Sequence, residues 1–189
     1  MRVAPPPRAS VLRGIVRIAR GRPDGLDQFA ATVQGFLASL APLLAFPLVA
    51  TMRALAIGGG IPAVADLFTA VALLLAPPVL SWEFARLWRR QDHWLRFATA
   101  FNWCQWLLPV LGTVLLMIIA ALLDAGLSQS AATGLLVLGL GSYGLWLHWF
   151  LARHGLALSR LRAALLVAGV NLGTALLVLL PRLLVLQRP

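Results

Sequence analysis

The chain has 189 residues, of which 60% are hydrophobic and 12% are charged. Its mean hydropathy is +0.87, and a soluble domain of this composition lacks the polar residues needed to cover its surface. The formal net charge is +10, and all 16 basic residues are arginine. In so apolar a chain, this charge favours anionic lipid over nucleic acid as the partner. The single cysteine, Cys104, excludes an intrachain disulfide and a metal site built from several cysteines.

Residues 1–29 predict a basic cytosolic arm. They hold six arginines, a run of three prolines and a glycine- and proline-containing turn at 21–25. Two faces of a helix can be assigned within the arm, an apolar face of Leu12, Ile15, Val16 and Ala19 and a basic face of Arg13, Arg17 and Arg20. We therefore expect a short interfacial helix that binds anionic headgroups. A solvated arm without structure is the alternative.

Residues 30–189 predict an all-α polytopic membrane protein with five transmembrane helices in a bundle. The expected spans are 30–52, 61–82, 97–123, 132–152 and 163–181, and each is close to or longer than the roughly 20 residues that cross a bilayer. None shows the apolar and polar alternation of a barrel strand. The second span is the weakest, because Asp66 lies near its start and Pro77 and Pro78 near its end, so a re-entrant segment is the alternative.

The distribution of arginine predicts the orientation of these spans. With five spans and a cytosolic N-terminus, thirteen arginines lie on the cytosolic side and three on the other. With four spans the arginines divide equally, which a positive-inside bias would not produce. All seven tryptophans also fall in the half of the bundle that this orientation places toward the cytosol. The sequence therefore predicts that the N-terminus is inside and the C-terminus outside.

The connection between the second and third spans is basic and aromatic. Its candidate headgroup-binding residues are Trp82, Arg86, Trp88, Arg89, Arg90 and Trp94. Tryptophan favours the headgroup region because its ring is apolar while its N–H needs a polar partner. We expect this segment to lie along the membrane surface and to bind anionic phospholipid. Docking of a protein partner on the same segment is the rival interpretation.

Four polar residues of the third and fourth spans form a candidate polar niche, namely Asn102, Gln105, Tyr143 and His148. The two amides lie at i and i+3, hence on one helix face, where they would either hydrogen-bond to a neighbouring helix or line a binding site. Haem would ordinarily need a pair of histidines at membrane depth, and only His148 qualifies. No catalytic motif or pair of intramembrane carboxylates is present. The sequence predicts neither an enzyme nor a cofactor or metal site.

Small residues predict close helix packing in the first, fourth and fifth spans. Gly169 and Gly173 form a GxxxG motif that encloses Asn171, and Gly35 and Ser39 have the same spacing. Gly134 and Gly141 similarly lack side-chain bulk. Such positions let two helix backbones approach each other, either within the chain or between two copies of it.

One stretch resembles a known membrane family. It comprises residues 141–146 (Gly-Ser-Tyr-Gly-Leu-Trp), residues 154–159 (His-Gly-Leu-Ala-Leu-Ser) and residues 162–165 (Arg-Ala-Ala-Leu). An aromatic end of the fourth span, a short glycine-containing link and an alanine-rich fifth span resemble the bacterial branch of the five-span YIP family of Rab-interacting-protein relatives. The acidic and aromatic signature of the eukaryotic relatives is missing. The resemblance implies a membrane-organising or transport-associated protein without catalysis.

The sequence thus predicts a non-catalytic integral protein of the bacterial cytoplasmic membrane. We expect a scaffold or accessory subunit that packs through its spans against a membrane-protein partner or a second copy, while its cytosolic face binds anionic phospholipid. A small transporter or permease component that uses the polar niche is the alternative.

Overall fold

The computed structural model describes residues 10–186 of the chain, and the side chains of residues 10–179. The arginines of the arm at positions 2 and 8 lie outside the described residues. The regular elements are α1 (Val11–Ala19), η1 (Pro23–Gln28), α2 (Val33–Ala56), α3 (Gly60–Leu87), α4 (Gln91–Cys104), α5 (Leu107–Asp124), α6 (Gln129–Gly155) and α7 (Arg160–Leu186). All of them are helical, which confirms the predicted fold class.

Five helical segments are long and apolar enough to cross a membrane, as predicted. They are residues 33–56, 60–87, 91–124, 129–155 and 160–179. The third segment combines α4 and α5. These helices extend beyond the expected spans at most of their ends, because the apolar core of a bilayer sets only the minimum length of a spanning helix.

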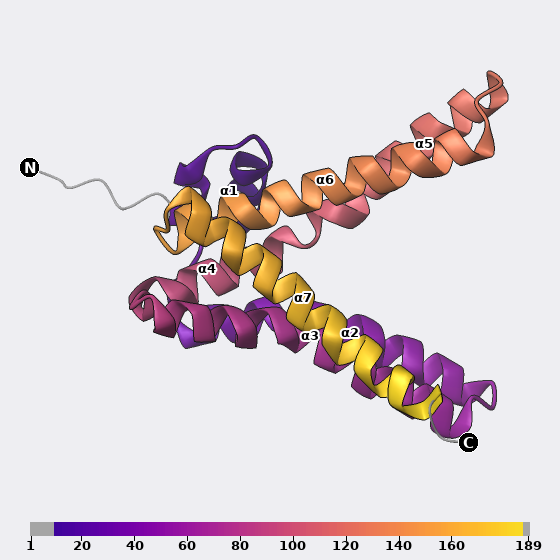
Figure 1. Cartoon of the computed structure of the whole chain (residues 1–189), viewed down its shortest axis with the longest axis horizontal. Helices are drawn as coiled ribbons and strands as arrows, with labels where there is room; N and C mark the ends of the chain where they lie inside the picture. The colour runs from indigo at the N-terminus through magenta and orange to yellow at the C-terminus, as the bar shows by residue number, and fades with distance from the viewer. Residues whose placement is uncertain (1–9, 187–189) are drawn as a thin grey trace, which may run out of the picture.

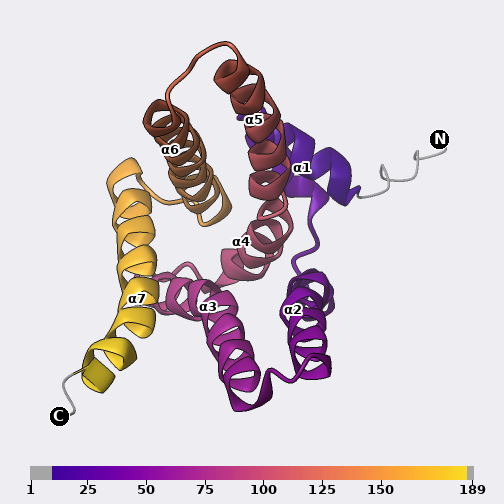
Figure 2. The ribbon, with the colours of Figure 1, turned by 90° about the vertical axis from the view of Figure 1, so that its right-hand side faces the viewer.

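The helices converge at one end of the molecule and separate into two arms toward the other (Figure 1). One arm is the hairpin of α5 and α6, and the other contains α2, α3 and α7. We call the converging end the apex; α1, η1 and α4 lie there. Figure 2 looks along the arms toward the apex, and α5 and α6 stand apart from α2 and α3 in this view. The expected bundle is therefore continuous only at the apex.

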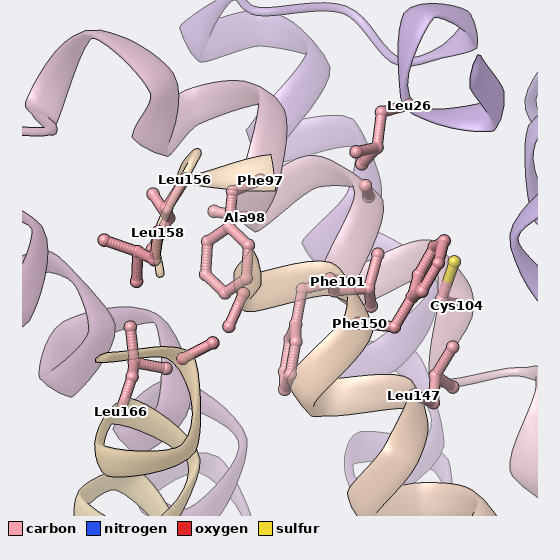
Figure 3. Close-up of a cluster of buried hydrophobic side chains, with 14 of the residues drawn as sticks. Leu26, Phe97, Ala98, Phe101, Cys104, Leu147, Phe150, Leu156, Leu158 and Leu166 are labelled. Atoms are coloured by element: carbon pink, nitrogen blue, oxygen red, sulfur yellow. The ribbon is translucent and has the colours of Figure 1, made fainter. Parts of the chain in front are cut away.

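The main hydrophobic cluster lies at the apex (Figure 3). Phe97 and Phe101 of α4 pack there with Leu147 and Phe150 of α6. Leu166 of α7 belongs to the same cluster, as do residues of η1 and of the link between α6 and α7. Side chains from elements far apart in the sequence thus share one core, which holds the two arms together at this end.

The second span is one continuous helix rather than a re-entrant loop. α3 runs for 28 residues and contains Pro77 and Pro78 without ending at them. Asp66 lies in its second turn and is exposed. Short turns join the helices at the far ends of the arms: Gly58 has a φ of 88° before α3, and Gly126 has a φ of 99° between α5 and α6. Glycine adopts such positive φ values without the steric cost that a Cβ brings.

The third span is interrupted where α4 meets α5. The regular helix breaks at Gln105 and Trp106, one turn before Pro109. Proline has no N–H to donate to the carbonyl four residues before it, and its ring crowds that carbonyl. The carbonyl in question belongs to Gln105, and it accepts instead from the N–H of Leu108 at 3.3 Å.

The basic connection at 82–96 forms a tight helical hairpin, and its location along the membrane surface stays a prediction. Its first half is the last part of α3 and its second half is the start of α4. A tight turn joins them, in which Arg89 has a φ of 55° and the N–H of Arg90 donates to the carbonyl of Ala85 at 2.7 Å. Trp82 and Trp94 pair across this helical hairpin. Such tertiary contacts, rather than the amphipathic pattern of the isolated segment, decide how it folds.

Candidate functional site

The helix predicted in the basic arm exists and is docked on the apex. Ser10 caps α1 by accepting from the N–H of Arg13 at 3.4 Å. Ile18 is completely buried in the apical cluster, beside Phe29 from the end of η1. A methyl group on Gly14 would lie 2.7 Å from the ring of Phe29, so the two segments meet at van der Waals distance. Residues 10–29 of the arm are therefore part of the folded apex.

The face of α1 that is buried differs from the face expected. Gly14 and Ile18 point into the protein, whereas Leu12 and Val16 are 75% and 47% exposed. The expectation assumed that the whole apolar face would meet the membrane. Docking of α1 against the core buries only one edge of its apolar face. Leu12 and Val16 therefore stay on the outer surface beside the arginines.

The outer surface of α1 carries a hollow of about 390 Å³. Its lining consists of Leu12, Arg13, Val16, Arg17, Arg20 and Arg22. Arg17 Nη1 lies 3.0 Å from Asp24 Oδ2, in an ion pair that is partly exposed. Within residues 10–179, the other three arginines of the hollow form no ion pair with a carboxylate. Guanidinium groups in this arrangement attract phosphate, and the two aliphatic side chains suit the tail of the same amphiphile.

The candidate residues of α3 and α4 take two different roles. Trp94 is half-buried, donates from Nε1 to Ser81 Oγ at 3.2 Å, and meets Trp82 edge to face at 5.0 Å between ring centroids. Trp88 packs on Phe84 at 5.3 Å. These contacts are structural. Trp82, Arg86 and Arg89 stay exposed, and Arg86 Nη2 pairs with Glu83 Oε2 at 2.9 Å.

Asn102 makes a buried hydrogen bond between two helices. Its Nδ2 donates to Ser39 Oγ at 2.9 Å, and that hydroxyl in turn donates to the carbonyl of Phe36 at 2.6 Å. Asn102 is 2% exposed and Ser39 is completely buried. The amide thus joins α4 to α2, which is the packing role that the sequence left open beside a binding role.

The other residues of the expected polar niche face different neighbours. Tyr143 donates from its hydroxyl to the carbonyl of Ala19 in α1 at 3.5 Å. His148 packs on Phe101, with ring centroids 4.8 Å apart. Gln105 is half-buried at the break between α4 and α5. The described contacts do not unite these side chains with Asn102, so the niche expected from the sequence is not assembled.

The GxxxG motif of α7 packs against α3. A methyl group on Gly169 would lie 2.5 Å from the ring of Phe84, and one on Gly173 would lie 2.8 Å from Leu80. The partner helix is therefore within the chain. Asn171 inside the motif donates to the carbonyl of Val167 in its own helix at 2.7 Å and does not cross to a neighbour.

The three remaining glycines do not bring helices of the chain together. The nearest atoms to an added methyl group on Gly35 belong to Ala30 and Thr32, which precede α2. Gly134 and Gly141 have no neighbour within 4 Å of such a group. Within the chain, these three glycines make no close approach between helices, because a small residue permits contact but the packing of the whole helix decides which face makes it. Contact with a second copy at these positions stays a prediction.

A polar hollow of about 330 Å³ lies on the apex near η1, α4 and the end of α6. Arg96 Nη1 and Asp27 Oδ1 line it and lie 3.4 Å apart. His93 and His154 also line it. Among the described residues, no group of three or more histidine, cysteine, aspartate or glutamate side chains is placed to hold a metal ion.

Comparison with family models, with characterised proteins and with solved structures gives no match for this chain.

Sequence reasoning missed several contributors to the apical surface. Arg22 lines the hollow on α1 although it follows the helix. Arg162 lies over the ring of Trp88 at 5.9 Å, and Arg153 lies over that of Trp149 at 5.3 Å. The second of these pairs has the i, i+4 spacing that brings side chains together on a helix, so the sequence alone could have indicated it.

Proposed function

We propose that this protein is a non-catalytic scaffold or accessory subunit of the bacterial cytoplasmic membrane, with its apex on the cytosolic side and bound to anionic phospholipid. The observation that carries the proposal is the arginine-lined hollow on α1. It combines guanidinium groups, which bind phosphate, with Leu12 and Val16, which are exposed beside them. A helix with this surface is suited to the headgroup region of an anionic bilayer.

The separation of the two arms supports the scaffold role. α5 packs mainly against α6, and it exposes large apolar side chains such as Val110 and Met117, at 62% and 69%. In a bilayer these faces meet either lipid or the helices of another membrane protein or a second copy. Three of the polar residues predicted for a transport niche, Asn102, Tyr143 and His148, make separate packing contacts, which favours the scaffold over the permease alternative. The resemblance to the five-span YIP family is compatible with this role and stays a prediction.

Lipid titration of the purified full chain tests the proposal. We expect each of the substitutions Arg13→Gln, Arg20→Gln and Arg22→Gln to weaken binding of phosphatidylglycerol by about fivefold, because an arginine near an anionic surface contributes about 1 kcal/mol. Native mass spectrometry counts the bound lipids, and phosphatidylcholine serves as the neutral comparison. The matched control is Arg53→Gln, an exposed arginine at the far end of α2. Equal losses at all four positions contradict a site on α1.

The same spectra test the scaffold role. A polypeptide or a second copy of the chain that stays bound in defined stoichiometry after extraction in mild detergent supports it. A lone chain that carries only lipid contradicts it.

A further inference from the structure

An apolar groove of about 380 Å³ lies between α2 and α3 near the apex. It is distinct from the hollow on α1. Phe36 and Leu40 line it from α2, and α3 contributes one face that runs from Leu75 to Trp82. Trp94 of α4 lines the groove as well.

The sequence accounts for the shape of this groove. On α3, residues 75, 78, 79 and 82 follow the i, i+3, i+4, i+7 spacing of a single helix face. The ring of Trp94 is held in place by its hydrogen bond to Ser81, and it packs on both Trp82 and Phe36, with centroids 5.0 and 5.2 Å away. The apical part of the groove is therefore a wall of fixed aromatic rings.

The groove is open toward the side of the molecule, where a bilayer surrounds a spanning helix. Val79 is 60% exposed and Trp82 is 37% exposed along it. A hydrocarbon chain, which is much thinner than the about 10–12 Å of a helix, can lie along this open groove.

The charged residues beyond the aromatic end of the groove indicate which kind of amphiphile it binds. Arg86 follows Trp82 by four residues and shares its helix face, and Arg89 lies in the turn that follows α3. Both are exposed. Arg86 Nη2 pairs with Glu83 Oε2 at 2.9 Å, so a phosphate at this level meets the remaining N–H groups of Arg86 and the guanidinium of Arg89, while the chain attached to it runs along the apolar face toward Leu75.

We infer that this groove binds one acyl chain of an anionic phospholipid, with the phosphate at the level of Trp82 and Arg86. The inference rests on the proposed membrane role and adds to it a specific intramembrane lipid site, separate from the surface contact of α1. It makes the lipid a bound component of the apex, seated where α2, α3 and α4 meet.

The test uses the full chain reconstituted into vesicles of phosphatidylglycerol and phosphatidylcholine at equal amounts, extracted in mild detergent and examined by native mass spectrometry. We expect one phosphatidylglycerol to be retained per chain, in at least fivefold preference to phosphatidylcholine. Val79→Trp fills the groove and should lower this retention at least tenfold. The matched control is Val137→Trp on α6, which is 63% exposed in the wild type, lies outside the groove and should leave retention unchanged.

Helical circular dichroism and a single elution peak establish that the variants are folded, and Val79→Phe replaces Val79→Trp if the latter is not. Equal retention in the two tryptophan variants overturns the inference, as does equal retention of the two lipids by the wild type. Loss of a bound polypeptide in Val79→Trp, with lipid unchanged, overturns it as well and identifies a protein contact. The arginine substitutions on α1, measured in parallel, separate failure of this site from failure of the proposed function.

Discussion

At the scale of single residues, one buried polar pair holds two of the spans together. Asn102 and Ser39 are both buried and meet each other through one hydrogen bond between α4 and α2. A buried polar group that loses its partner costs more than the bond itself contributes, because no water replaces it. We therefore expect this pair to matter for stability rather than for transport.

A double-mutant cycle tests this role. We expect Asn102→Ala and Ser39→Ala each to lower the free energy of unfolding by about 0.6–2 kcal/mol, with a coupling of about 0.6–1.7 kcal/mol between them. Unfolding in mixed micelles, followed by circular dichroism, provides the measurement. Thr113→Ala is the control, because this exposed hydroxyl bonds only to the carbonyl of Pro109 in its own helix. A coupling near zero would show that the two side chains act independently.

At the scale of helices, α7 is joined to α3 through a close approach at two glycines. The ring of Phe84 fills the space beside Gly169, and the side chain of Leu80 fills the space beside Gly173. Dispersion between closely packed atoms and small residues at the contact stabilise such pairs in a membrane, where no hydrophobic effect drives helix association. The contact uses the face of α7 that the GxxxG motif marks.

Adding one methyl group measures the importance of this contact. Gly169→Ala should lower the free energy of unfolding by about 1–3 kcal/mol, because the new Cβ overlaps the ring of Phe84. Gly134→Ala is the matched control, since nothing lies within 4 Å of the added group. We expect it to be neutral or slightly stabilising through its helix propensity. Combination with Phe84→Leu should recover part of the loss at Gly169, and equal effects of the two alanines would refute the contact.

At the scale of the whole molecule, five spans place the apex and the tips of the arms at opposite ends. Apart from Arg53, every arginine whose side chain is described lies on the elements and turns at the apex. Among the described residues, the connections at the tips are short turns, around Gly58 and Gly126. With the positive-inside bias, this asymmetry favours an apex in the cytosol.

Cysteine labelling in intact cells checks this orientation. Single cysteines are introduced by Ser130→Cys near one tip and by Ser159→Cys at the apex, in a chain that carries Cys104→Ala; both serines are exposed. A membrane-impermeant maleimide should label only Ser130→Cys from outside, and Ser159→Cys only after permeabilisation. The reverse pattern means that the orientation is inverted. Labelling of both from outside contradicts a crossing of the membrane by α6, which lies between the two positions.

The number of spanning helices and the end that holds the tryptophans followed from the sequence alone. Each depends on the composition of one segment, since about 20 apolar residues span a bilayer regardless of their neighbours. The docking of α1, the break near Gln105 and the partners of Asn102, Tyr143 and His148 were decided by the tertiary structure. These features depend on which helix faces meet, and the same residue type can pack, bind or remain exposed according to the neighbour that the fold supplies. The groove between α2 and α3 belongs to this second group, because it exists only where three helices place their apolar faces together.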